Sequence, residues 1–75
     1  MNRVELRKVL VAHDIPPSAY DLDGTWKNDA YILRDDGAGW TIYYHERGIR
    51  RPVAFCGTEE EACERLFDQL RELKP

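Results

Sequence analysis

The neighbouring residues His45 and Glu46 are the pair in this sequence whose chemistry comes nearest to an acid–base couple. They fall within "WTIYYHER", a run typical of a strand, and adjacent strand residues point to opposite faces, so Glu46 cannot orient His45 as a triad acid would. Ser18 is the single serine, and it stands in a proline-rich turn rather than in a nucleophile elbow. We therefore expect no enzyme activity, and an exposed, pH-sensitive histidine at position 45.

Potential metal ligands are present, but they are not spaced as a metal site. The chain has two cysteines, Cys56 and Cys63, and two histidines. Together they fit neither a disulfide framework nor the ligand spacing of a zinc site. The turn "DDGAG" lacks the lysine and the helix start of a phosphate loop. We expect no metal, no cofactor and two buried thiols in a reducing compartment. The aspartates of the turns do not form a calcium-binding loop; they are Asp21, Asp23, Asp29, Asp35 and Asp36.

Two helices can be placed from apolar periodicity. The first spans residues 3–13 and ends before Pro16 and Pro17. Val4 and Val11 lie on its outer side, where either another part of the chain covers them or a small apolar strip is exposed. The second begins after Thr58, which forms a capping-box pattern with Glu61. The first stripe is Leu6, Val9, Leu10 and His13, and the second is Ala62, Cys63, Leu66, Phe67, Leu70 and Leu73.

Between the helices the sequence predicts strands at residues 30–34, 40–47 and 51–56, joined by short turns. This spacing predicts an antiparallel meander with the second strand in the centre and Pro52 on an edge strand. Tyr20 to Gly24 could add a fourth strand. Alternation directs one set of side chains to the core and leaves Thr41, Tyr43, His45 and Arg47 on a wet face. The core set is Tyr31, Leu33, Trp40, Ile42, Tyr44, Val53 and Phe55.

The expected fold class is therefore α+β, in the order α-β-β-β-α, with a three- to four-stranded antiparallel sheet covered on one face by the terminal helices. A chain of 75 residues has room for a single domain, here residues 1–75. The first residues lack an export pattern, and no run of about 18 apolar residues occurs, so we expect a cytoplasmic protein that does not enter the membrane. Monomer and homodimer both remain open.

This element order resembles that of double-stranded-RNA-binding domains, which grip phosphates with lysines at the start of their last helix. Here the corresponding segment carries glutamates, so nucleic acid is an unlikely partner. An RNA-associated or regulatory role stays as the alternative. It depends on an aromatic and basic set on or beside the wet face of the sheet: Tyr43, His45, Arg47, Arg50 and Arg51.

A protein-binding role fits the charge pattern better. The net charge is −3, and acids gather at the start of the last helix, which favours a basic partner. Tyrosine and arginine on the wet face are residue types that often carry interface energy. The predicted partner-binding residues are Tyr43, His45, Arg47, Arg50, Arg51, Glu59, Glu60 and Glu64. The interface could be the sheet face, the acidic helix start or the strip of Val4 and Val11.

Three stretches carry a family resemblance: "AYDLDG", "AYILRDDGAGWTIYYHERG" and "FCGTEEEACERLFDQL". The chain resembles small bacterial proteins that are encoded beside polymorphic toxins and act as their immunity proteins. The resemblance covers most of residues 19–70 and rests on motifs that belong to the fold. It implies a cytoplasmic antidote that binds and occludes a toxin domain without chemistry of its own, with residues 43–47 and the acids before Ala62 as its contact surfaces.

Overall fold

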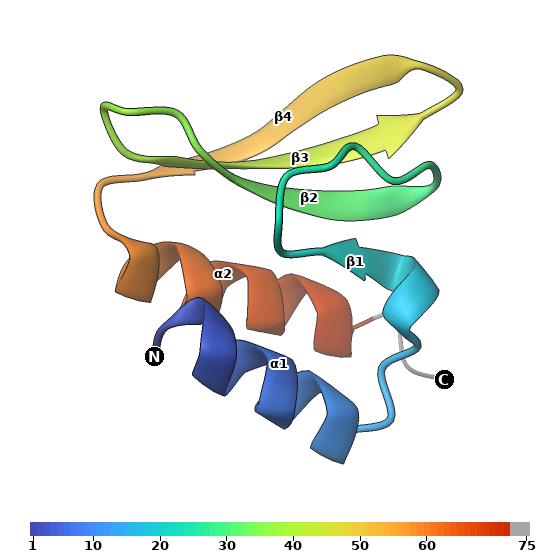
Figure 1. The fold of residues 1–75 in the computed structure, drawn as a ribbon, viewed down its shortest axis with the longest axis vertical. Coiled ribbons are helices and arrows are strands. Elements are labelled where there is room, and N and C mark those ends of the chain that lie inside the picture. The colour runs from blue at the N-terminus through green and yellow to red at the C-terminus, as the bar shows by residue number, and fades with distance from the viewer. Residues whose placement is uncertain (73–75) are drawn as a thin grey trace.

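The computed structural model describes residues 1–72, which form two layers, a pair of helices and a four-stranded sheet (Figure 1). Helices α1 and α2 lie side by side against one face of the sheet. This arrangement confirms the α+β class and the two terminal helices. The elements are α1 (Arg3–Ala12), the 3-10 turn η1 (Pro17–Ala19), β1 (Tyr20–Asp21), β2 (Ala30–Asp35), β3 (Trp40–Glu46), β4 (Ile49–Cys56) and α2 (Glu59–Arg71).

The sheet has the order β1-β2-β3-β4, and its last three strands form the predicted antiparallel meander. Pro52 lies on the edge strand β4, where a missing N–H donor breaks no ladder. The fourth strand is present as the two residues of β1. It runs parallel to β2, so the prediction of a wholly antiparallel sheet is wrong and the sheet is mixed. Parallel neighbours require the chain to cross the sheet between them, and residues 22–29 make that crossing.

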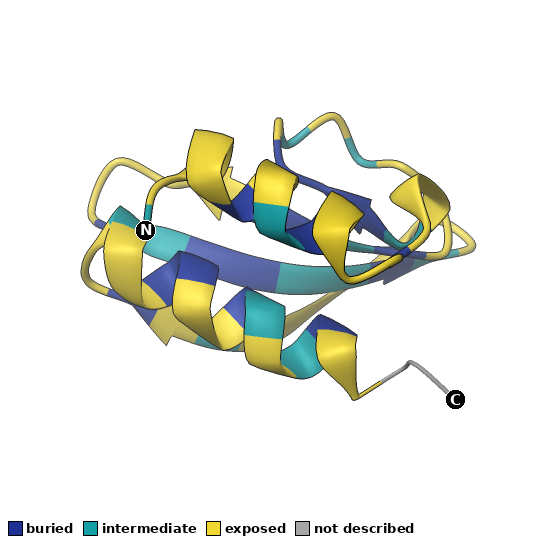
Figure 2. Ribbon diagram, turned by 90° about the horizontal axis from the view of Figure 1, so that it is seen from below, coloured by how far each residue is buried: buried dark blue, intermediate teal, exposed yellow. Residues whose placement is uncertain are grey.

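Both helices begin with a side-chain cap. In α1 the cap is a complete capping box, in which Asn2 accepts from the backbone N–H of Glu5 and the Glu5 carboxylate accepts in return from that of Asn2. In α2 the Thr58 hydroxyl accepts from the backbone N–H of Glu61 at 3.1 Å, which is one half of the predicted capping box. The inner sides of both helices are buried and their outer sides are exposed (Figure 2). Leu73, the last residue of the predicted stripe, lies outside the described residues.

The core lies between the helices and the sheet. Leu6 and Leu10 of α1 and Leu66 and Leu70 of α2 are fully buried, together with Ile42 at the centre of β3. The two thiols are buried in the same cluster, as expected. Three of the predicted core residues are only half-buried: Tyr31, Trp40 and Tyr44.

The prediction that Val53 and Phe55 belong to the core is wrong, because they are 43% and 61% exposed. Cys56 lies directly opposite Trp40, and residues opposite one another share a face of the sheet. Phe55 therefore points away from the helices. A register shift between Ile42 and Tyr43 places an extra residue in β4. The side chains that β4 turns towards the core are consequently Ala54 and Cys56.

The second face of the sheet is also partly covered, contrary to the prediction that it is wet. Residues 22–29, here called the strap, run from the end of β1 to the start of β2 and cross this face (Figure 1). Ala30, Ile32 and Thr41 point to the strap side and are buried. The part of the second face nearest β4 carries the exposed side chains.

Candidate functional site

The strap is held in place by one buried carboxylate. Asp21 accepts hydrogen bonds from the backbone N–H groups of Asp23 at 3.0 Å and Lys27 at 3.1 Å, and from the Thr25 hydroxyl at 2.9 Å. Burial alone raises the pKa of Asp21, but these hydrogen bonds outweigh it and leave the pKa below its ordinary value. The ionised carboxylate thus organises the strap. Trp26, between these anchor points, has a left-handed backbone with φ of 63°, which the surrounding bonds must stabilise.

His45 fastens the strap to the sheet. Its Nδ1 lies 3.1 Å from the Lys27 carbonyl oxygen, and because a carbonyl can only accept, Nδ1 donates and carries the hydrogen. The side chain is 7% exposed, so the prediction of an exposed histidine is wrong. The strap accounts for the difference, since it covers a strand face that alternation alone leaves open. His45 is thereby occupied in positioning the strap.

Aromatic and basic side chains of β2, β3 and β4 surround the ring of Trp26. Its ring makes edge contacts with Tyr43 and His45, with centroids 4.9 Å and 5.6 Å apart. The guanidinium carbon Cζ of Arg50 lies 3.8 Å from the centroid of the indole ring, and that of Arg34 lies 5.4 Å from it. We call these five residues the Trp26 cluster. Sequence reasoning missed Trp26 and Arg34; the available signal was a tryptophan within a polar turn, where its large ring must find apolar cover.

An exposed apolar row borders the Trp26 cluster. It consists of Pro52, Val53 and Phe55 on β4. Pro52 lies opposite Tyr43 and Phe55 lies opposite Thr41, so the row belongs to the same face of the sheet as the cluster. The row and the cluster together form the uncovered half of the second face.

The structure divides the predicted basic and aromatic set. Tyr43, His45 and Arg50 meet in the Trp26 cluster. Arg47 is exposed in the β3–β4 hairpin turn, where its φ of 52° is followed by the positive φ of Gly48. Arg51 lies opposite Tyr44, on the helix side of the sheet. Five residues that the sequence placed in one patch therefore lie in three places.

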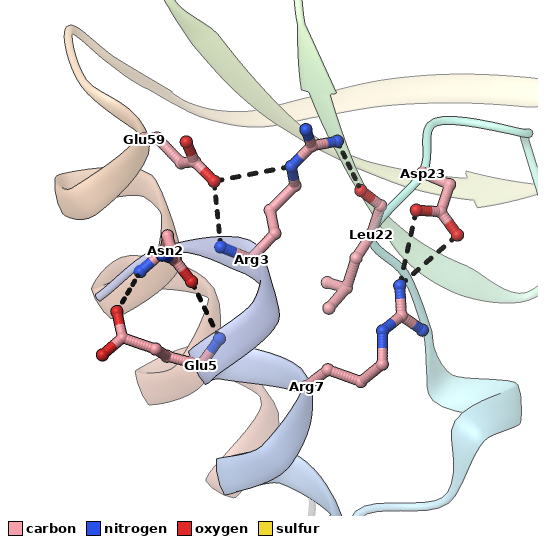
Figure 3. A network of polar contacts seen from close by, with 7 residues as sticks. All are labelled: Asn2, Arg3, Glu5, Arg7, Leu22, Asp23 and Glu59. Carbon is pink, nitrogen blue, oxygen red and sulfur yellow. Dashed lines mark hydrogen bonds and ion pairs between the residues drawn. The ribbon is translucent and has the colours of Figure 1, made fainter.

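The acidic start of α2 is partly used within the fold (Figure 3). A carboxylate oxygen of Glu59 accepts from the backbone N–H of Arg3 at 2.9 Å and lies 3.5 Å from its Nε. Glu60 lies 3.9 Å from the amino nitrogen of Met1. Glu64 is exposed, and its side chain forms no hydrogen bond or ion pair with the rest of residues 1–72. Glu59 thus ties α1 to α2, and the acidic surface open to a partner is smaller than the sequence suggested.

The same side of the molecule ties α1 to the strap. Arg7 reaches both carboxylate oxygens of Asp23 at 3.4 Å, and Arg3 donates to the Leu22 carbonyl oxygen at 3.4 Å (Figure 3). The guanidinium of Arg3 also lies over the Trp40 ring at 5.2 Å. These two arginines are therefore engaged in holding the layers together.

The two thiols are buried, and the histidine, cysteine and acidic side chains of the described residues do not gather into a metal site. Burial, followed by the charge of Glu61, raises the pKa of Cys56, and burial raises the pKa of Cys63 to about 11, so both thiols are protonated at neutral pH. Within residues 1–72, no three histidine, cysteine or acidic side chains gather closely enough to hold a metal ion. In the same part of the chain, neither helix has the length and apolar character needed to span a bilayer.

Comparison of the chain with models of protein families, with curated proteins and with solved structures gives no match.

Proposed function

We propose that this chain is a non-enzymatic protein-interaction domain that binds a partner through the uncovered half of its second sheet face. One observation carries the proposal: Val53 and Phe55 are exposed on β4, whose Pro52 lies opposite Tyr43 of the Trp26 cluster. Apolar groups exposed together often mark an interaction surface, and tryptophan, tyrosine and arginine are the types that most often supply binding energy. Steric occlusion of the partner then requires no chemistry from this chain.

The resemblance to immunity proteins suggests which kind of partner the domain binds. An immunity-type inhibitor would bind a toxin domain in the cytoplasm and cover its working surface. The shared stretch "WTIYYHERG" supplies β3 and the turn after it, including Tyr43 of the Trp26 cluster. Glu60 and Glu64 remain exposed at the start of α2, so they can still attract a basic region of the partner, whereas Glu59 is engaged with Arg3.

The free chain is proposed to be a monomer, because both edges of the sheet resist pairing with another copy. The β1 edge is only two residues long, and β4 carries a proline, a bulge and two arginines. Sedimentation of the free chain at micromolar concentration checks this point.

Coexpression with the product of the neighbouring gene tests the proposed function. We expect a stable complex with the wild-type chain and its loss in Phe55→Ser. Val11→Ser is the matched control, because Val11 on α1 is 62% exposed and Phe55 is 61% exposed. Circular dichroism verifies that both variants fold. Loss of the complex in Val11→Ser alone would move the interface to α1, and recovery of nucleic acid without any protein partner would overturn the proposal.

An RNA-associated role is the second candidate, supported by the arginines and aromatic rings of the Trp26 cluster. Bases bind such proteins by stacking on open ring faces. Here Arg50 lies 3.8 Å from the centroid of the Trp26 ring, and Tyr43 contacts the same ring edge-on. Stacking of a base would have to displace these contacts, so protein binding is preferred.

A further inference from the structure

We infer that Arg34 and Arg50, held against Trp26, form a receptor for two carboxylate groups of an extended acidic segment in a protein partner. The inference rests on the proposed function and adds the chemistry of the partner at this surface. It also differs from the expectation of a wholly basic partner, which followed from the acids of α2.

The side chain of Arg50 forms no hydrogen bond or ion pair with residues 1–72, so its N–H groups remain for a ligand. Its Cζ lies 3.8 Å from the centroid of the Trp26 ring, so the guanidinium is in van der Waals contact with the indole. Stacking occupies the face of a guanidinium and leaves the N–H groups in its plane directed outward. Arg34 uses one of its N–H groups on the Gly24 carbonyl oxygen at 3.1 Å, and the others remain for a ligand.

The spacing suits two acidic side chains of one strand-like segment. Both arginine Cζ atoms lie near the centroid of the same indole ring, at 3.8 Å and 5.4 Å, so their separation is at most about 9 Å by geometry. Side chains two positions apart on an extended chain are about 6.6 Å apart and point to the same side. Each arginine can then bind one carboxylate, in the bidentate geometry that favours arginine over lysine.

The charges at this surface are not balanced by ion pairs within residues 1–72. Arg3, Arg7 and Arg71 each form an ion pair with an acidic side chain, whereas Arg34 and Arg50 form none with residues 1–72. The acids of the strap do not neutralise them. Asp21 is turned inward to its three donors and Asp23 binds Arg7, while Asp29 is exposed without an ion pair to either arginine.

The surroundings favour binding of such a segment. The indole holds both side chains in place, so less side-chain freedom is lost when a ligand arrives. Val53 and Phe55 lie on the same face and can cover apolar side chains of the segment, which reduces access of water to the charged contacts.

The probe is a capped peptide, Gly-Glu-Val-Glu-Val-Glu-Gly, compared with its counterpart in which glutamine replaces each glutamate. Binding is followed by shifts of the backbone and indole N–H signals in NMR spectra. We expect shifts at the strap and β4, no binding of the glutamine peptide, and dissociation constants about tenfold higher for Arg34→Gln and Arg50→Gln. Arg65→Gln, which removes the same charge from α2, should leave the dissociation constant within about twofold of the wild-type value.

Arg50→Lys is the control that separates loss of the arginine contacts from unfolding of the variant and from a change in net charge. It keeps the charge but loses the planar fork, so binding should weaken nearly as much as in Arg50→Gln while the spectrum stays native. Wild-type affinity in Arg50→Lys, or equal weakening in Arg65→Gln, would overturn the inference. The same holds if the glutamate peptide does not bind at millimolar concentration, or if a ten-nucleotide oligouridylate alone binds in an arginine-dependent way.

If the free chain forms a dimer and Arg50→Gln makes it monomeric, the surface binds a second copy and the inference is wrong.

Failure of the inference and failure of the proposed function can be told apart. If the peptide does not bind but the partner complex still depends on Phe55, the proposed function stands and the inference is wrong. If the peptide binds as expected and no partner complex forms, the acidic receptor stands and the proposed function is wrong.

Discussion

Replacing Asp21 by alanine should detach the strap from the second face of the sheet. Asp21 is buried and accepts three hydrogen bonds from strap groups, two from backbone N–H groups and one from a hydroxyl. A hydrogen bond to a charged group contributes about 1.5 to 3 kcal/mol, but in the variant the strap donors can turn to water. We therefore expect the free energy of unfolding to fall by about 2 to 4 kcal/mol. Asn at this position keeps one acceptor oxygen and should cost about half as much.

The assay is urea unfolding, with the emission of Trp26 as a local reporter in a Trp40→Phe background. For a domain of this size, each kcal/mol corresponds to a fall of about 4–8 °C in Tm, so thermal melting gives a second reading. Detachment of the strap should also shift Trp26 emission to longer wavelength under native conditions. Asp23→Asn is the control, because that carboxylate binds Arg7 in an exposed ion pair at 3.4 Å and should contribute less than about 1 kcal/mol.

The pH dependence follows from the same carboxylate. The pKa of Asp21 is below its ordinary value in the folded chain, so its contribution is present above the unfolded pKa and is lost as pH falls through the folded pKa. Stability of the wild-type chain should decline below about pH 4, and less steeply in Asp21→Asn.

The reasoning on Asp21 would be refuted if Asp21→Ala lowered the free energy of unfolding no more than Asp23→Asn does and left Trp26 emission unchanged.

Three further experiments test other parts of the structure. Glu59→Gln weakens the link between the two helices, so unfolding in urea should lose about 1 kcal/mol, whereas Glu60→Gln should change little. Cys63, whose pKa burial raises to about 11, should resist thiol reagents at about pH 8 until urea is added, as peptide mapping can show. Gly39→Ala brings a Cβ within 2.7 Å of a β4 carbonyl oxygen and should cost about 1–3 kcal/mol in thermal melting; Gly57→Ala meets open space and should melt as the wild type.

Local signals were sufficient to predict the elements and the fold class. Thr58 as a cap, the apolar stripe of α2 and the prolines after α1 each act within a few residues, so sequence spacing alone reveals them. Pro52 identified β4 as an edge strand for the same reason, since the missing donor is a property of one residue. The meander followed from short turns between the strands.

The candidate site could not be predicted because it depends on register and on a crossing loop. An extra residue in β4 decides which of its side chains face the helices, so strict alternation places Val53 and Phe55 on the wrong side. Trp26 lies in a segment of polar turn residues, and its ring contacts Tyr43 and His45 on the face of the sheet that is turned away from the helices. Such contacts join segments that are far apart in the sequence, so no local sequence pattern predicts them.

The parallel pairing of β1 with β2 has a consequence for the order of folding. The meander joins neighbouring segments through short turns, whereas β1 can pair only after the strap has crossed the sheet and closed a longer loop. The surface around Trp26 is therefore completed last. A chain that has formed the meander without the strap exposes buried residues, and Arg34 and Arg50 do not yet lie against Trp26. If the proposed function holds, a partner would bind only molecules that have finished folding, and native-state hydrogen exchange should show the strap opening before the meander.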